Sequence, residues 1–242
     1  MKRTLVIGDI HGGLKALIQV LERAEVTKND TLIFLGDYVD GWSASAQTIQ
    51  YLIELSKQQD CIFILGNHDL WCKLWLEKGT TNPIWLAHGG KETMNSYIKT
   101  GYLMEESHKT FFNQLKNYHL DSSNRLFIHA GFTSMHGVEK EYNENDFYWD
   151  RTLWEAARIL KQVNDKKHSE IETRLSLYNE IYIGHTPTTN YGTEEPINAA
   201  NLWNVDTGAA FTGRLSIMDI ITKEFWQSDP LIELYPNEKG RN

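Results

Sequence analysis

Short apolar runs alternate with polar turns and amphipathic segments along the first third of the chain. Residues 4–7, 31–35 and 62–65 are apolar and rich in β-branched side chains, which predicts three buried strands. A polar turn containing glycine follows each run, and apolar residues at helical spacing come next, as at Leu14 and Leu17. Successive units of this kind predict parallel strands that are joined by right-handed helical crossovers.

The turns that follow these three strands contain carboxylate, amide and imidazole side chains. These are Asp9 and His11, Asp37 and Asp40, and Asn67 and His68. The carboxyl ends of parallel strands lie at one edge of a sheet, where α/β proteins bind their ligands. We therefore expect the six side chains to meet in space.

The second half of the chain repeats this pattern less regularly. Residues 125–128 and 180–183 predict two further strands, which end at His129 and His185. Antiparallel strands that close a second sheet are predicted at 201–205, 215–221 and 225–226. An α/β fold with two mixed sheets flanked by helices explains the whole pattern better than a single open sheet.

Residues 77–124 interrupt the pattern of strands. Residues 85–90 predict a loop, and helices are expected near 91–99 and 105–116. We interpret 77–124 as a helical insertion that caps the site. Because no linker is visible in 242 residues, we predict one domain over 1–242.

The composition excludes several classes of protein. A formal net charge of -8 argues against binding to a nucleic acid polymer. The two cysteines, Cys61 and Cys72, form neither a zinc knuckle nor a thiol phosphatase loop. No apolar run reaches the roughly 18 residues of a membrane helix, and the first apolar run is too short for a signal peptide. We predict a cytoplasmic protein that does not bind membranes.

The mixture of ligand types at the predicted strand ends indicates a transition-metal site. Oxygen ligands combined with imidazoles suit Mn, Fe or Zn, whereas an oxygen-only set would favour Mg or Ca. A carboxylate between two groups of ligands can bridge two ions about 3.5–4 Å apart, with a shared water or hydroxide as nucleophile. The sequence therefore predicts a site for two metal ions.

Five segments of the chain resemble a known family in order and spacing. They are Gly8-Asp9-Ile10-His11-Gly12, Gly36-Asp37-Tyr38-Val39-Asp40, Gly66-Asn67-His68-Asp69, His129-Ala130-Gly131-Phe132 and Gly184-His185-Thr186. They resemble the signature blocks of calcineurin-like metallophosphoesterases, and most of all the bacterial branch of the phosphoprotein phosphatases. That branch also includes symmetrical diadenosine tetraphosphate hydrolases. The resemblance implies the four-layer metallophosphoesterase fold, a β-sandwich between helices.

The resemblance also implies roles for individual residues. Two divalent or mixed-valence ions are expected, most of all Mn, with Fe or Zn as alternatives. Asp37 would bridge the ions, His68 would be the general acid and Asp40 would orient it. The implied nucleophile is a metal-bridging hydroxide, so that no phosphoenzyme is needed. The implied metal ligands are Asp9, His11 and Asp37 for one ion, and Asp37, Asn67, His129 and His185 for the other.

The chain departs from the family pattern after Asp40. Phosphoprotein phosphatases continue with Arg-Gly, and that arginine binds the substrate phosphate, whereas this chain has Gly41-Trp42. Arg151 resembles another phosphate-binding arginine of the family, and Lys91 and Asn67 are further candidates for substrate binding. Because position 41 lacks the arginine, we predict that Arg151→Ala loses most phosphoester turnover. We also hypothesise that Trp42 narrows the mouth of the site and changes substrate choice.

Three functions remain open at the level of sequence. The preferred interpretation is a serine/threonine protein phosphatase that also accepts phosphotyrosine, with phosphorylated proteins or small phosphoesters as partners. The first alternative is a dinucleoside polyphosphate hydrolase, in which Trp42, Trp85 or Tyr97 would stack on adenine. The second alternative is a non-catalytic module that binds a phosphorylated partner. The sequence does not indicate an oligomeric state.

Overall fold

The first of two five-stranded sheets contains the strands whose turns carry Asp9, Asp37 and Asn67. The computed structural model describes residues 2–163 and 172–241. The first sheet has the order β10-β9-β1-β2-β3, in which β1, β2 and β3 are parallel and β9 and β10 are antiparallel to their neighbours. Its strands are β1 (Thr4–Ile7), β2 (Thr31–Phe34), β3 (Asp60–Phe63), β9 (Ser216–Asp219) and β10 (Phe225–Gln227).

The second sheet has the order β4-β5-β6-β8-β7. Strands β5, β6 and β8 are parallel, and β4 and β7 are antiparallel strands at the two edges. The strands are β4 (Tyr118–Leu120), β5 (Arg125–Ile128), β6 (Glu180–Ile183), β7 (Ile197–Ala199) and β8 (Leu202–Asn204). Both sheets are therefore mixed, as the sequence predicted.

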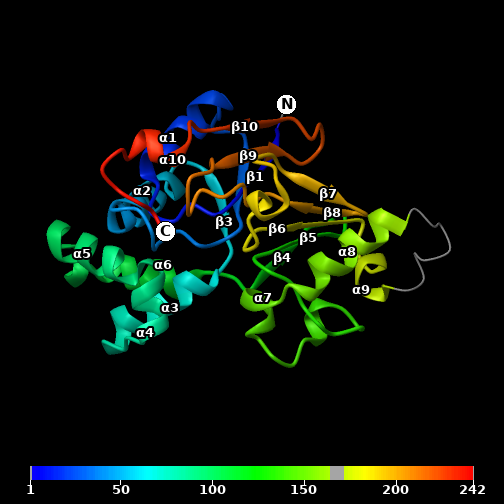
Figure 1. The fold of residues 1–242 in the computed structure, drawn as a ribbon, viewed down its shortest axis with the longest axis horizontal. Helices are drawn as coiled ribbons and strands as arrows, with labels where there is room; N and C mark the ends of the chain where they lie inside the picture. The colour runs from blue at the N-terminus through cyan, green and yellow to red at the C-terminus, as the bar shows by residue number, and fades with distance from the viewer. Residues whose placement is uncertain (1, 164–171, 242) are drawn as a thin grey trace.

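Helices cover the outer faces of both sheets, so that the strands lie between two helical layers (Figure 1). In Figure 1, α3, α4, α5 and α6 form a group on the left, and α7, α8 and α9 lie on the right. No helix among residues 2–163 and 172–241 combines the length and the apolar character that crossing a bilayer requires. The helices are α1 (Leu14–Arg23), α2 (Ser45–Ser56), α3 (Asn67–Lys78), α4 (Pro83–Trp85), α5 (Lys91–Thr100), α6 (Glu106–Gln114), α7 (Asp146–Trp149), α8 (Thr152–Val163), α9 (Thr173–Ser176) and α10 (Leu231–Leu234).

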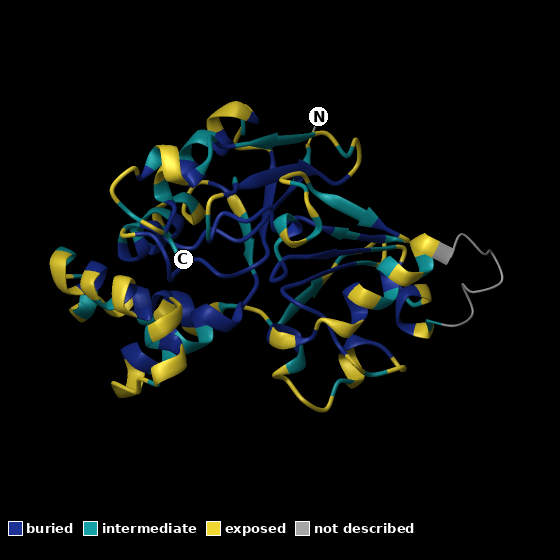
Figure 2. Cartoon of the chain, viewed as in Figure 1, coloured by how far each residue is buried: buried dark blue, intermediate teal, exposed yellow. Residues whose placement is uncertain are grey.

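Alternation of side chains along the strands produces this layering. In β1, Leu5 and Ile7 pack with the residues of α1 and α2, whereas Val6 points into the cluster between the sheets. Phe127 of β5 and Tyr182 of β6 stack in that central cluster with ring centroids 4.9 Å apart. Because both faces of these strands are buried, their sequences are continuous apolar runs, and Figure 2 shows the centre of the molecule as buried.

The prediction for the last three strands was wrong in part. Only β8 joins the second sheet, where it is parallel to β6, while β9 and β10 return to the first sheet. Strand β9 pairs with the side of β1 that β2 leaves free, which covers an edge that would otherwise expose unpaired backbone groups. The sequence pattern showed strands here but not their partners.

The prediction of a loop at residues 85–90 was also wrong. This stretch contains the end of α4 and a π-helical turn at Leu86–Gly90, which is broken at His88 and Gly89. Gly89 has φ +102°, and a Cβ there would lie 2.5 Å from the backbone nitrogen of Gly41. The turn therefore packs directly against the loop that follows β2.

Candidate active site

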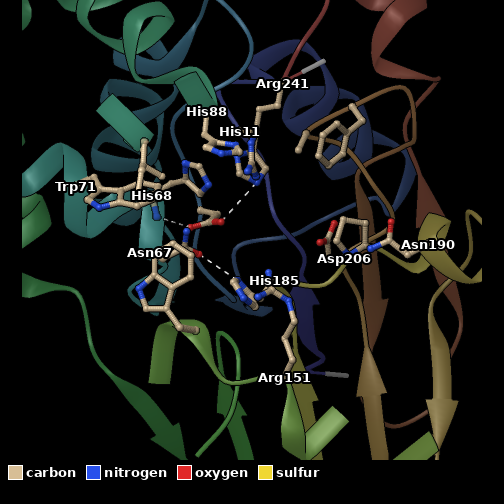
Figure 3. Close-up of a pocket in the computed structure, with 16 residues that line it drawn as sticks. His11, Asn67, His68, Trp71, His88, Arg151, His185, Asn190, Asp206 and Arg241 are labelled. Carbon is tan, nitrogen blue, oxygen red and sulfur yellow. Dashed lines mark hydrogen bonds and ion pairs between the residues drawn. The ribbon is translucent and has the colours of Figure 1, made fainter. Parts of the chain in front are cut away.

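The turns after β1, β2, β3 and β6 meet around a cavity of about 270 Å³. His11, Asp37, Asn67 and His185 line it, each from a different turn. Figure 3 shows the side chains of His11, Asn67 and His185 pointing into the same space. His129, at the end of β5, is fully buried beside them. The structure thus brings together residues that are up to 176 positions apart in the sequence, such as Asp9 and His185.

Asp37 lies at the centre of the cluster. Its Oδ2 atom is 3.5 Å from Nε2 of His11 on one side and 3.5 Å from Nε2 of His129 on the other. Oδ2 of Asp9 lies 3.9 Å from Nε2 of His11. Two groups of possible metal ligands share Asp37, one with His11 and His68 and the other with His129 and His185, and the ligand atoms of each group lie within 4.8 Å of one another.

The histidines are oriented as metal ligands usually are. Nδ1 of His11 lies 2.9 Å from the carbonyl oxygen of Asp40, and Nδ1 of His129 lies 2.8 Å from that of Leu35. A proton held on Nδ1 by a carbonyl leaves the lone pair of Nε2 free for an ion. Nε2 of His185 is buried and has no hydrogen-bond partner among the described residues. The donor set therefore fits two divalent ions.

Amide and carboxylate groups complete the cluster. Oδ1 of Asn67 lies 3.1 Å from Nε2 of His129 and 3.0 Å from Nδ1 of His185. Burial raises the pKa of Asp37 to about 7, and burial together with repulsion from Asp206 and Asp37 raises the pKa of Asp9 well above its usual range. Carboxylates buried this closely favour a bound cation, which would stabilise their ionised forms.

Backbone conformations at the strand ends aim these side chains. His11, Asp37 and His185 have φ values of 52°, 55° and 67°, in the left-handed region that non-glycine residues seldom adopt. Such conformations cost free energy and cluster at functional sites. A Cβ on Gly66 would collide with the Asp37 carboxylate, so only glycine fits before Asn67.

His68 and Asp40 form a buried pair beside the metal-ligand cluster. Nδ1 of His68 lies 2.6 Å from Oδ2 of Asp40, and Asp40 also accepts hydrogen bonds from Trp85 Nε1 at 2.7 Å and Thr93 Oγ1 at 2.6 Å. Burial lowers the pKa of His68 and raises the pKa of Asp40. With Nδ1 held by Asp40, Nε2 of His68 is the nitrogen left for a substrate.

The two predicted cations lie in different places. Arg151 lines the cavity, and its side chain makes no hydrogen bond or ion pair with any described residue. Lys91 is exposed at the start of α5 and does not line the cavity. The reason is that α5 packs its other face, including Thr93 and Tyr97, into the protein, which turns Lys91 outward.

The three aromatic residues that were expected to stack on adenine are all buried, which contradicts that prediction. Trp42 donates a hydrogen bond from Nε1 to the carbonyl oxygen of Ala209, so it cannot narrow the mouth of the site either. Trp85 binds Asp40, and the hydroxyl of Tyr97 lies 2.9 Å from Nδ1 of His108. Each aromatic residue has its polar atom satisfied inside the protein, as buried tryptophan and tyrosine usually require.

Other aromatic residues, which sequence reasoning missed, form one wall of the cavity. Trp71 makes edge contacts with His68 and with Trp149, both at 5.1 Å between ring centroids, and Trp149 reaches His185 at 5.8 Å. Trp149 is 38% exposed. Trp71 could have been found from its position three residues after His68, on the same face of α3.

The far side of the cavity comes from residues 206–241. Phe211, Asp206 and Arg241 line it, and Figure 3 shows Arg241 and Arg151 on opposite sides of the labelled histidines. After burial, Arg241 is the group that most strongly lowers the pKa of His11. No motif in the sequence indicated Arg241.

The sequence of the chain matches the family model for calcineurin-like phosphoesterases over residues 2–208. A protein of Oceanobacillus iheyensis named bis(5'-nucleosyl)-tetraphosphatase PrpE [asymmetrical] is 26% identical over 91% of this chain and 89% of its own length. A symmetrical bis(5'-nucleosyl)-tetraphosphatase of Marinomonas sp. is 27% identical over 69% of this chain and 52% of its own length.

Solved structures share the fold at lower sequence identity. A protein provisionally described as a diadenosine tetraphosphatase has a TM-score of 0.64 and 17% identity over 93% of this chain and 92% of its own. A protein serine/threonine phosphatase of Saccharomyces cerevisiae has a TM-score of 0.57 and 12% identity over 94% and 80%. These likenesses confirm the predicted arrangement of two sheets between helices.

Proposed function

The chain belongs to the calcineurin-like phosphoesterase family, and we propose that its substrates within that chemistry are dinucleoside tetraphosphates. Membership makes it a metal-dependent phosphoester hydrolase, and the alternative of a non-catalytic binding module is set aside. The two groups of ligands that share Asp37 support divalent ions as its cofactors. We propose manganese as the ion, because imidazole and carboxylate ligands are mixed at the site.

One observation carries the choice of substrate. The cavity combines a cluster of possible metal ligands and two arginines with aromatic rings, since Trp149, which is 38% exposed, and the partly buried Phe211 line it together with Arg151 and Arg241. Guanidinium groups suit a chain of phosphates, and aromatic rings suit a nucleobase. A phosphorylated serine or threonine side chain presents no base for the aromatic residues to bind.

The named relatives favour the same choice. The asymmetrical PrpE protein aligns with 91% of this chain, whereas the symmetrical enzyme aligns with 69%. We therefore propose asymmetric cleavage, which would convert diadenosine tetraphosphate into ATP and AMP. Symmetric cleavage would instead yield two molecules of ADP.

The residues of the chain have distinct parts in the proposed reaction. Ions bound by Asp9, His11, Asp37, Asn67, His129 and His185 would supply Lewis acidity toward phosphoryl oxygens and a reactive water. Arg151 binds a phosphate through its unpaired guanidinium. His68 gives a proton from Nε2 to the departing oxygen, while Asp40 holds its ring in place through the 2.6 Å contact with Nδ1.

Protein phosphatase activity, the interpretation preferred from sequence, becomes the second possibility. The solved protein phosphatase is similar at 12% identity, a level that speaks for the fold alone. Nothing in the described cavity selects a phosphopeptide over a nucleotide. Hydrolysis of dinucleoside tetraphosphates therefore has more support than protein phosphatase activity.

The decisive experiment compares initial rates of manganese-loaded protein on diadenosine tetraphosphate, a phosphoserine peptide and a phosphotyrosine peptide. We expect the dinucleotide to be preferred, with ATP and AMP as products resolved by chromatography. His68→Asn is the matched control, because it keeps a polar side chain but cannot transfer the proton. Preference for either peptide would contradict the proposal, and ADP as the product would contradict the asymmetric cleavage.

A further inference from the structure

The end of the chain returns to the site and contributes a positive charge to it. Residues 235–241 follow α10 and pack on the loop that begins at Gly41. Tyr235 stacks on Trp42 with ring centroids 5.2 Å apart. Glu238 accepts hydrogen bonds from the backbone nitrogen of Ser43 at 2.8 Å and from its hydroxyl at 2.6 Å. This segment is therefore attached by both apolar and polar contacts.

The last step of this path places Arg241 in the cavity. Gly240 has φ +61° and packs against the ring of Trp42, where a Cβ would lie 2.8 Å from Cζ2. The backbone nitrogen of Arg241 donates a hydrogen bond to the carbonyl oxygen of Ala210 at 2.9 Å. The guanidinium carbon then lies 5.4 Å from the ring centroid of Phe211, so an aromatic face limits its position.

Arg241 occupies the space next to Gly41, where the phosphoprotein phosphatases that the chain resembles have an arginine. A Cβ on Gly41 would lie 3.1 Å from Cγ of Arg241. Gly41 itself has φ +121°, a conformation that disfavours any side chain. The backbone conformation at position 41 of this chain thus disfavours an arginine there, while a residue 200 positions later brings one next to it.

The guanidinium of Arg241 has N–H groups that donate no hydrogen bond to the described residues. Its Nε atom is buried without a hydrogen-bond partner, and no described residue forms an ion pair with the group. An unpaired buried donor costs free energy, so the arrangement favours an anionic ligand. The guanidinium lines the same cavity as His11 and Asp37.

We infer that Arg241 is a substrate-binding residue, which holds a phosphoryl group of the substrate from the side opposite Arg151. This inference rests on the proposed hydrolysis of phosphoesters but not on which phosphoester is the substrate. The segment 235–241 and Trp42 are positioning elements for this arginine. Trp42 thereby acquires a structural role in place of the selectivity role that the sequence suggested.

The test measures binding of inorganic phosphate to manganese-loaded protein by calorimetry, alongside hydrolysis of p-nitrophenyl phosphate and diadenosine tetraphosphate. Arg241→Ala should weaken phosphate binding by about tenfold or more and raise KM, because a charge-assisted hydrogen bond is lost. Arg241→Lys should recover part of the affinity, and added guanidinium chloride at millimolar concentration should partly restore Arg241→Ala. Lys28→Ala, which removes an exposed charge between α1 and β2, is the matched control.

Manganese content and melting temperature are measured for every variant, since an unchanged value separates lost phosphate binding from lost metal or fold. Phosphate affinity of Arg241→Ala within about twofold of the parent would overturn the inference. If Arg241→Ala binds phosphate more weakly but the parent does not hydrolyse diadenosine tetraphosphate, Arg241 is a phosphate-binding residue and the proposed substrate is wrong. If Arg241→Ala binds phosphate normally and the parent hydrolyses the dinucleotide, the inference about Arg241 is wrong and the proposed substrate is retained.

Discussion

The floor and the rim of the cavity are built in different ways. The floor consists of the proposed metal ligands Asp9, His11, Asp37, Asn67, His129 and His185, which are all at most 8% exposed. The rim consists of Trp71, Trp149, Arg151, Phe211 and Arg241. Floor residues sit in turns held by backbone contacts, whereas the guanidiniums of the rim have no hydrogen-bond partner among the described residues. The difference suggests that the floor performs the chemistry and the rim selects the substrate.

The largest effect is expected at the centre of the floor. Asp37→Asn keeps the shape of the side chain but removes the charge that both ligand groups share, so both ions should bind weakly. We expect turnover to fall by about 10³-fold or more. Metal content by mass spectrometry and initial rates would measure the change, with Asp60→Asn on the exposed end of β3 as control. Retention of two ions at full occupancy would show that Asp37 is not shared.

The second largest effect is expected at His68, the proposed general acid beside the floor. His68→Asn should reduce turnover by about 10²-fold to 10³-fold, a typical contribution of a general acid, while metal content stays unchanged. The same histidine also lies close enough to His11 and Asp37 to be a ligand. A variant that loses one ion would therefore assign His68 to the metal site and remove it from proton transfer.

A smaller effect is expected for Arg151 on the rim. From sequence alone, Arg151→Ala should abolish most turnover, because no other arginine was evident. With Arg241 in the same cavity, we instead expect KM to rise about tenfold and kcat to change little. Steady-state kinetics would distinguish a higher KM from a lower kcat. A fall in kcat of about 10²-fold at constant KM would support the prediction made from sequence, that Arg151→Ala loses most turnover.

The smallest effect is expected for an aromatic residue of the rim. Trp149→Ala should raise KM for diadenosine tetraphosphate about fivefold through lost stacking, yet leave p-nitrophenyl phosphate unaffected. The ratio of kcat/KM for the two substrates is the measurement. Tyr142→Ala, at a residue that is 99% exposed, serves as the control. Equal losses of kcat/KM on both substrates would mean that Trp149 stabilises the floor of the cavity and does not stack on a nucleobase.

Much of the floor could be predicted because its signals are local. The bounds of β1, β5 and β6 agree with the apolar runs at 4–7, 125–128 and 180–183. Each run is short, buried on both faces and followed by a turn, so the position of the next side chain follows from the strand itself. The partners of β8 and β9 could not be predicted, because pairing depends on which strand edges are free in the assembled sheets.

The sequence by itself determined the bounds of β1, β5 and β6, the candidate metal ligands that follow the strands and the absence of an arginine at position 41. These properties depend on periodicity and turn chemistry within a few residues. The sequence placed the third strand at 62–65, two residues later than β3 (Asp60–Phe63). Only the tertiary structure decided that Trp42, Trp85 and Tyr97 are buried and that Arg241 reaches the cavity. Those outcomes depend on contacts between segments far apart in the chain, such as Trp42 with Tyr235, which no local pattern encodes.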